Sequence, residues 1–108
     1  MLIEVNKENF ETEVSQAEGV VFVDFWSPKC VPCMALFPDV EAFAERNAGK
    51  AKFCKLDAST NMRLSLSQKV MGLPAFVFYK DGERVFTFDK DSIEMDAVEA
   101  KLHELLDA

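Results

Sequence analysis

A single run of residues, Val20-Val21-Phe22-Val23-Asp24-Phe25-Trp26, constrains the fold of this chain more than any other segment. Apart from one carboxylate, the run consists of β-branched and aromatic residues, with no alternation between apolar and polar positions. Such a run is typical of a strand that is buried on both faces, as in a central sheet covered by helices. The sequence therefore predicts an α/β fold in which this segment is a central strand.

Helical and extended patterns alternate along the rest of the chain. We expect a short strand over residues 2–5, helices over 7–17, 30–48, about 62–70 and from 91 onward, and further strands over 51–57, 75–79 and 83–88. Ser59 or Thr60 is the expected cap of the short third helix, which Gly72-Leu73-Pro74 should break. Asp81-Gly82 between two extended runs is a strong hairpin signal. Asp91 to Glu94 has the form of a capping box, so the last helix is expected to begin there.

Length and charge narrow the possible functions. The chain has 108 residues, with 12 basic and 19 acidic side chains and a formal net charge of −7. One hydrophobic core forms readily at this length, so a single domain over residues 1–108 is expected. The acidic balance argues against partners with phosphate-rich surfaces, namely nucleic acid and anionic membranes. No apolar run approaches the roughly 20 residues that cross a bilayer.

The cysteine count points to a reducing compartment. Three cysteines is an odd number, and a chain of this size does not depend on disulfides for its stability. The first residues carry several charges and lack the apolar stretch of a secretory signal. A cytoplasmic location is therefore expected.

Two of the cysteines, Cys30 and Cys33, have the Cys-x-x-Cys spacing, which suits either redox chemistry or a metal. Cys30 falls in the turn after the central strand and Cys33 in the first turn of the next helix, where Pro32 is tolerated. Residues three apart on a helix are neighbours, so the two sulfurs can form a bond. The partial positive charge of the helix start, together with Lys29, favours the thiolate of Cys30, which is the attacking species in disulfide exchange. Cys33 would be more buried and would resolve the mixed disulfide.

Asp24 is the one charged residue inside the central run. A buried carboxylate is rare unless it is paired or functional, and burial should raise its pKa and allow it to exchange a proton with Cys33. Lys55, on the neighbouring expected strand, is a possible partner that would hold Asp24 in place. The alternative is a register that exposes Asp24 in an ordinary surface ion pair.

These residues together resemble the thioredoxin family. The resemblance is carried by Phe25-Trp26-Ser27-Pro28-Lys29-Cys30-Val31-Pro32-Cys33, by Pro38 in the following helix and by Gly72-Leu73-Pro74 before a strand, and it extends over essentially the whole chain. It implies a thioredoxin fold, with a mixed central β-sheet flanked by about four helices. It also implies a dithiol–disulfide oxidoreductase.

The resemblance assigns a role to each matching position. Cys30 corresponds to the nucleophilic cysteine and Cys33 to the resolving one, with Asp24 and Lys55 as the buried acid–base pair behind them. Pro74 corresponds to the family's cis-proline, and the residue before it, Leu73, would lend its backbone to a bound peptide. The residues expected to contact a substrate are Trp26, Val31, Pro32, Gly72, Leu73 and Pro74.

The chain also departs from the family pattern. Lys29 replaces an aromatic residue, Val31 a glycine and Met34 a lysine, and Asp89-Lys90-Asp91 stands where a loop glycine is common. The site is therefore a Lys-Cys-Val-Pro-Cys variant. These changes alter the contact surface and the local charge, and with them the reduction potential and the choice of partners.

The function expected from the sequence is reduction of protein disulfides through Cys30 and Cys33. The partners would be disulfide-containing client proteins and a thioredoxin reductase or equivalent reductant, and the protein would act as a monomer without cofactor or metal. Three alternatives remain open. One is an oxidase or isomerase, which Lys29 could favour by stabilising the reduced form. The others are a redox-inactive binding domain and a metal site, for which Cys54 and His103 are the only further ligands of the cysteine and histidine type.

Overall fold

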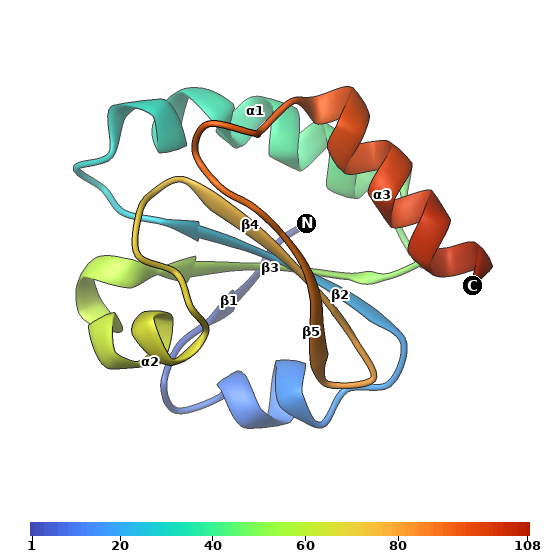
Figure 1. Cartoon of the computed structure of the whole chain (residues 1–108), viewed down its shortest axis with the longest axis horizontal. Helices are drawn as coiled ribbons and strands as arrows, with labels where there is room; N and C mark the ends of the chain where they lie inside the picture. Colours follow the sequence, from blue (N-terminus) through green and yellow to red (C-terminus); the bar gives the residue numbers. More distant parts are fainter.

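The computed structural model describes all residues from 1 to 108, and its centre is one five-stranded sheet in the order β1-β3-β2-β4-β5 (Figure 1). The elements along the chain are β1 (Ile3–Val5), η1 (Glu11–Ser15), β2 (Val20–Trp26), α1 (Val31–Arg46), β3 (Lys52–Asp57), η2 (Ala58–Thr60), α2 (Met62–Ser67), β4 (Ala75–Lys80), β5 (Glu83–Phe88) and α3 (Met95–Asp107). β1, β3 and β2 are parallel, whereas β4 and β5 are antiparallel to their neighbours. The predicted mixed sheet and the order of its elements are confirmed.

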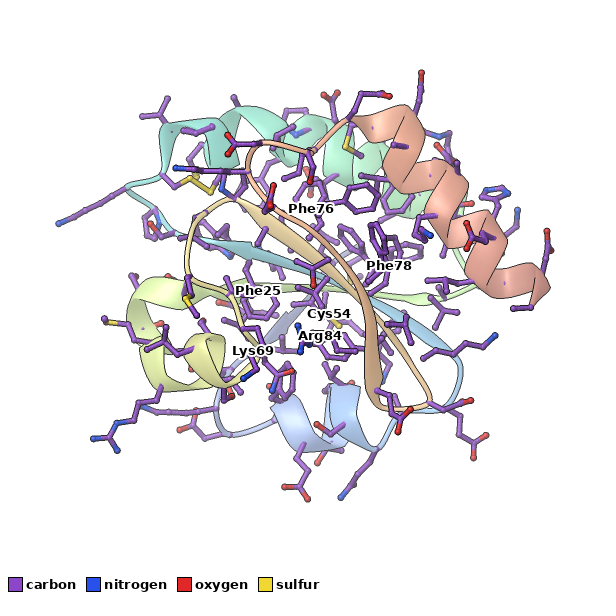
Figure 2. All side chains as sticks on the ribbon, viewed as in Figure 1. Phe25, Cys54, Lys69, Phe76, Phe78 and Arg84 are labelled. Atoms are coloured by element: carbon purple, nitrogen blue, oxygen red, sulfur yellow. A yellow bond between two sulfur atoms is a disulfide. The ribbon has the colours of Figure 1, made fainter.

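Helices cover both faces of the sheet. α1 and α3 lie on one face, while η1 and α2 lie on the other (Figure 1). Each face has its own buried cluster, and β2 contributes to both because its side chains alternate between them. Figure 2 shows Phe76 and Phe78 on the side of α1 and α3, with Phe25 and Cys54 on the opposite side. This two-sided burial explains the nearly continuous apolar run of β2.

Phe22 of β2 is the centre of the cluster under α1. Its ring lies 5.2 to 6.1 Å, centroid to centroid, from four other phenylalanine rings, those of Phe43, Phe53, Phe76 and Phe78. Three of these four contacts are edge-to-face, the geometry that aromatic quadrupoles favour. The aromatic cluster thus ties α1 to three strands and fixes the position of the helix on the sheet.

The hairpin between β4 and β5 forms at Asp81-Gly82, as predicted. Both turn residues have positive φ, 50° for Asp81 and 85° for Gly82, which fits a two-residue turn with the twist of the flanking strands. The turn is joined to the segment before β2, because the Asp81 N–H donates to the Gly19 carbonyl (2.9 Å) and the Gly19 N–H donates to the Asp81 carboxylate (2.8 Å).

The first helical segment is shorter than the sequence indicated. Asn6 caps the turn that leads into it, since its side-chain oxygen accepts hydrogen bonds from the N–H groups of Glu8 (2.9 Å) and Asn9 (3.1 Å). The regular part is a π-helical turn, in which the Gln16 N–H donates to the Glu11 carbonyl five residues earlier (2.8 Å). The expected helix over residues 7–17 is therefore correct in place but not in length or type.

Caps and ends near α2 also differ from expectation. Asp57, rather than Ser59 or Thr60, caps this region, because its carboxylate accepts a hydrogen bond from the Ser59 N–H (2.9 Å) at the start of η2. α2 ends before residues 72–74 are reached, and Lys69 beyond it has a left-handed φ of 66°. Gly72-Leu73-Pro74 is thus not what breaks the helix.

The last helix, α3, begins later than the proposed capping box. Glu94 is its N-cap, and the Glu94 carboxylate accepts a hydrogen bond from the Asp96 N–H (2.8 Å). The preceding residues form a turn of their own, in which Asp89 accepts hydrogen bonds from the N–H groups of Asp91 (3.1 Å) and Ser92 (3.0 Å). Because Asp91 is engaged in this turn, it does not cap the helix.

Replacing Gly82 by alanine should destabilise the fold, with Gly19→Ala as the matched control. Both glycines have positive φ, so both variants carry the left-handed strain of about 1–2 kcal/mol. A Cβ at Gly82 would meet the Ser15 carbonyl oxygen, while one at Gly19 meets nothing within 4 Å. Urea unfolding should therefore show a clearly larger loss for Gly82→Ala. Equal losses would contradict this packing of the hairpin against η1.

Candidate active site

Cys30 and Cys33 lie where the predicted strand end meets the helix start. Cys30 is the N-cap of α1, with φ −89° and ψ 102°, and its sulfur accepts a hydrogen bond from the Cys33 N–H (3.2 Å). The two sulfurs are bonded, and their Cα atoms are 5.2 Å apart. Cys30 is half-buried, whereas Cys33 is 1% exposed. The pair thus has one accessible and one shielded sulfur.

The residues around Cys30 face solvent. Lys29 and Pro32 are exposed, and Val31 is 78% exposed although it is a large apolar residue. Val31 and Pro32 occupy the first two positions of α1, where a missing backbone donor costs nothing. The N–H groups of this helix start supply partial positive charge beside Cys30, and that of Cys33 points at the Cys30 sulfur.

Asp24 lies on the face of β2 that α1 covers. It is paired in register with Phe76, which belongs to the cluster beneath α1 and α3. The side chain is 1% exposed, and neither carboxylate oxygen has a hydrogen-bond partner. Burial raises the pKa of Asp24 to about 7, against the opposing field of Lys55. The alternative register, with Asp24 at the surface, is wrong.

Lys55 does not form the expected ion pair with Asp24. The two residues are register partners on β3 and β2, yet their charged groups are not within 4.0 Å of each other. The Lys55 ammonium instead lies 5.9 Å from the centroid of the Trp26 ring and 5.7 Å from that of Phe37. Lys55 therefore acts on Asp24 through its field and not through a contact.

Trp26 and Phe37 form an aromatic pair beside the disulfide. Their rings are edge-to-face with centroids 5.0 Å apart, both residues are half-buried, and the indole N–H of Trp26 is buried without a partner. Sequence reasoning missed Phe37. Its position four residues after Cys33 could have indicated it, because i and i+4 residues share one face of a helix.

Leu73 and Pro74 lie at a groove next to the start of α1. The Leu73–Pro74 peptide bond is cis, as the resemblance implied. The amide and carbonyl groups of Leu73 make no hydrogen bond within the chain. A groove of about 480 Å³ is lined here by Pro32, Ala35, Leu36, Leu73, Pro74 and Lys90, among others. Pro32, Leu73 and Pro74 are thus brought together, although they are distant in sequence.

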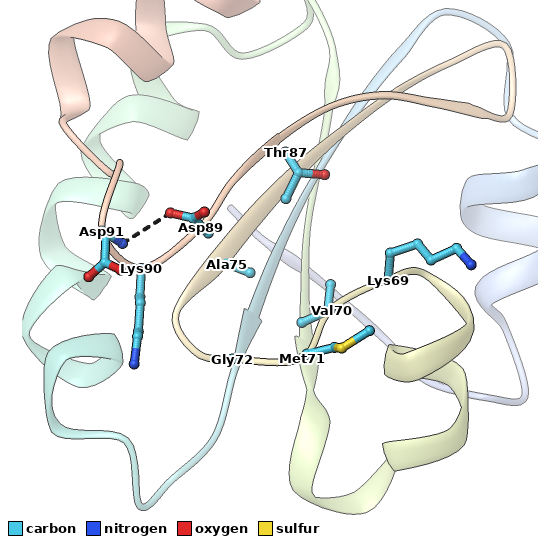
Figure 3. A pocket seen from close by; sticks show the side chains of 9 residues that line it. All are labelled: Lys69, Val70, Met71, Gly72, Ala75, Thr87, Asp89, Lys90 and Asp91. Carbon is cyan, nitrogen blue, oxygen red and sulfur yellow. Dashed lines mark hydrogen bonds between the residues drawn. The ribbon is translucent and has the colours of Figure 1, made fainter.

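Two further grooves flank the loop that contains Gly72. One, of about 440 Å³, is lined by both Lys69 and Lys90, which lie on opposite sides of it (Figure 3). The other, of about 190 Å³, lies against α2 and is mostly apolar, with Met62, Leu66 and Met71 in its lining. Met71 and Gly72 in the loop before β4 are therefore exposed, whereas Val70 and Pro74 on either side are buried.

Cys54 and His103 are not near the cysteine pair. Cys54 is fully buried in the cluster on the η1 and α2 side of the sheet, and burial raises the pKa of its thiol to about 12. His103 lies on α3, where its Nε2 is 3.9 Å from a carboxylate oxygen of Glu99. These residues do not converge with Cys30 and Cys33 on one site.

Comparison with known proteins decides the family. The family model described as Thioredoxin matches residues 1–104. The chain belongs to the thioredoxin family. A thioredoxin of Peptoclostridium acidaminophilum is 43% identical over 102 residues, which cover 94% of this chain and 93% of that protein. A thioredoxin of Acetoanaerobium sticklandii is 41% identical over 99 residues, covering 92% and 94%.

A solved structure shows the same fold. A mutant thioredoxin from Halobacterium salinarum superposes with a TM-score of 0.84 at 29% identity, covering 96% of this chain and 89% of that one. With the thioredoxin relatives and the bonded pair Cys30–Cys33, the protein is a dithiol–disulfide oxidoreductase. None of its helices is long and apolar enough to span a bilayer.

Replacing Asp24 by asparagine should stabilise the protein more at alkaline than at acidic pH. An aspartate with pKa near 3.9 in the unfolded chain and about 7 in the folded one makes folding less favourable as pH rises through that interval. Between pH 5.5 and 8.5 the stability gain of Asp24→Asn over wild type should grow by about 2 kcal/mol. Urea unfolding at both pH values measures this, and a gain independent of pH would contradict a buried, unpartnered carboxylate.

Proposed function

We propose that the protein reduces disulfides in client proteins and is itself returned to the dithiol by a reductase. The observation that carries this proposal is the placement of an accessible cysteine, Cys30, at the start of α1 and a shielded one, Cys33, one turn later in the helix that covers the Asp24 face of β2. Such an arrangement gives the two sulfurs different reactivity, which sequential disulfide exchange requires.

Cys30 is the proposed nucleophile. In the dithiol form its thiolate is stabilised by the partial positive charge at the start of α1 and by the Cys33 N–H that already points at the sulfur. The thiolate attacks one sulfur of the client disulfide. A bond forms between Cys30 and the client, the client disulfide breaks, and one client sulfur leaves as a thiolate.

Cys33 is the proposed resolving cysteine, with Asp24 as its proton acceptor. Asp24, with its raised pKa, can take the Cys33 proton near neutral pH. The Cys33 thiolate then attacks the Cys30 sulfur, the Cys30–Cys33 bond forms, and the second client sulfur leaves. The client gains two electrons and the pair is oxidised. Lys55 is the proposed electrostatic partner of Asp24.

The client is proposed to bind as an extended segment along the groove beside Leu73. The unpaired amide and carbonyl of Leu73 can hydrogen-bond to such a segment as a neighbouring strand does. Trp26, Val31, Pro32, Gly72 and Pro74 would complete the contact surface. The groove against α2 is mostly apolar, which fits the side chains of a peptide better than a compact charged ligand.

A reductant of this kind works where a reductase keeps it in the dithiol form. We therefore place the protein in the cytoplasm, with thioredoxin reductase or an equivalent reductant as a partner. All proposed site residues come from one chain in one domain, so a monomer suffices.

Lys29 favours a second candidate function, that of an oxidant. It is an exposed positive charge directly before Cys30. By stabilising the Cys30 thiolate it stabilises the reduced form, which raises the reduction potential of the couple. An oxidase or isomerase would use the same two cysteines in the opposite direction.

Replacing Cys33 by serine should trap clients on Cys30. The first exchange step needs only Cys30, whereas release of the client needs the second thiolate. A reduced Cys33→Ser protein incubated with lysate, or with insulin as a defined client, should therefore accumulate adducts that dithiothreitol releases. Non-reducing electrophoresis and mass spectrometry identify the linked cysteine.

Cys54→Ser provides the matched control, because Cys54 is buried away from the pair. This variant should reduce insulin like wild type and accumulate no adducts. If Cys33→Ser forms no adducts while wild-type protein reduces insulin, the proposed roles of the two cysteines are wrong.

Asp24→Asn should slow the second exchange step at neutral pH. An amide cannot accept the Cys33 proton, and loss of a general base typically costs roughly 10²-fold or more in rate. Stopped-flow measurement of client release from the preformed mixed disulfide isolates this step. The difference in release rate between Asp24→Asn and wild type should shrink as the pH rises, because Cys33 then ionises without a base. An unchanged rate at pH 7 would exclude Asp24 as the proton acceptor.

A further inference from the structure

The Lys55 ammonium lies away from the Asp24 carboxylate, although the two residues are neighbours in the sheet. Lys55 and Asp24 are register partners on neighbouring parallel strands. Facing side chains on adjacent strands begin about 5 Å apart, so a lysine is long enough to reach such a carboxylate. The Asp24 carboxylate is nevertheless without a partner, although an unpaired buried acid is costly. The Lys55 ammonium makes a different contact instead.

Two aromatic rings supply that contact. The Lys55 nitrogen lies 5.7 Å from the Phe37 centroid and 5.9 Å from the Trp26 centroid. Both distances lie within the range in which a cation is attracted to an aromatic face. The two rings also support each other in an edge-to-face contact at 5.0 Å. Phe37 comes from α1 and Trp26 from the end of β2, so the ammonium is held between helix and sheet.

We propose that Phe37 is a positioning residue for disulfide exchange: together with Trp26 it holds the Lys55 ammonium over the aromatic pair and so prevents an ion pair with Asp24. The carboxyl group thereby remains able to bind and release a proton near neutral pH. An ion pair would instead keep Asp24 ionised and make it a weaker base for Cys33. This consequence for catalysis rests on the proposed function, whereas the effect on Asp24 itself does not.

No charged group other than Lys55 is placed to form an ion pair with Asp24 or to shift its pKa. From β1 the register brings Glu4 beside Lys55, but Glu4 is exposed. On β3 the Asp57 carboxylate accepts hydrogen bonds at the start of η2. α1 contributes Cys33, which does not titrate while it is in the disulfide, and β4 contributes an aromatic ring. Lys55 is the charged residue whose field lowers the pKa of Asp24.

The test is a titration of Asp24 in the oxidised Phe37→Leu protein. Leucine keeps an apolar side chain but has no aromatic face, so Lys55 is released toward Asp24. The pKa of Asp24, followed by the chemical shift of its carboxyl carbon, should fall by about one unit, the lower end of the effect of an adjacent cation. Phe37→Tyr keeps the ring and should titrate like wild type. Phe37→Met is a second non-aromatic variant in case leucine disturbs the fold.

The Lys55→Met background separates this mechanism from water entry. If Phe37 acts through Lys55, adding Phe37→Leu to Lys55→Met should leave the Asp24 pKa unchanged. An equal fall in both backgrounds would mean that the ring only excludes water, and the proposal would be wrong. An unchanged or higher pKa in Phe37→Leu alone would also overturn it.

A kinetic measurement connects the titration to the reaction. In Phe37→Leu the pH profile of client release from the mixed disulfide should move to lower pH by the same interval as the Asp24 pKa. If the pKa falls but the profile does not move, Phe37 positions Lys55 as proposed and the role of Asp24 in catalysis is wrong. The two proposals thus fail separately.

Discussion

The burial of β2 on both faces is the constraint on which the site depends. Because β3 and β4 pair with its two edges and helices cover its two faces, a carboxylate placed at Asp24 has no route to water. The same strand ends just before Cys30, so the helix that covers Asp24 also begins with the reactive pair. Burial destabilises an ionised Asp24 and thereby raises its pKa to about 7. In the proposed mechanism this pKa allows Asp24 to accept the Cys33 proton, so the same burial that costs stability supplies the base.

Much of this arrangement can be predicted from the sequence, because its signals are local. The β2 run, the Asp81-Gly82 hairpin and the Cys-x-x-Cys spacing each indicate their own backbone geometry, and all three predictions agree with the structure. The thioredoxin fold follows from their order along the chain. The start of α3 could not be read in the same way, because Asp91 and Glu94 fit a capping box in the sequence and only the competing turn at Asp89 decides between them.

The contacts around Asp24 and Lys55 depend on packing between elements and not on local sequence. Asp24 and Lys55 were expected to pair because they lie on neighbouring strands, and the register agrees with that expectation. The ammonium nevertheless lies over Trp26 and Phe37. Periodicity assigns Phe37 to a helix face but does not say which side chain of the sheet it meets. The charge and aromatic distribution around Asp24 therefore became visible only in the folded chain.

Cys30 and Cys33 are proposed to form a couple that donates electrons to protein disulfides. The reduction potential of this couple can be measured by equilibration with glutathione redox buffers. We expect a value near that of reducing thioredoxins, about −270 mV. A value near that of a strong oxidant, about −120 mV, would contradict it and would assign the dominant influence to Lys29.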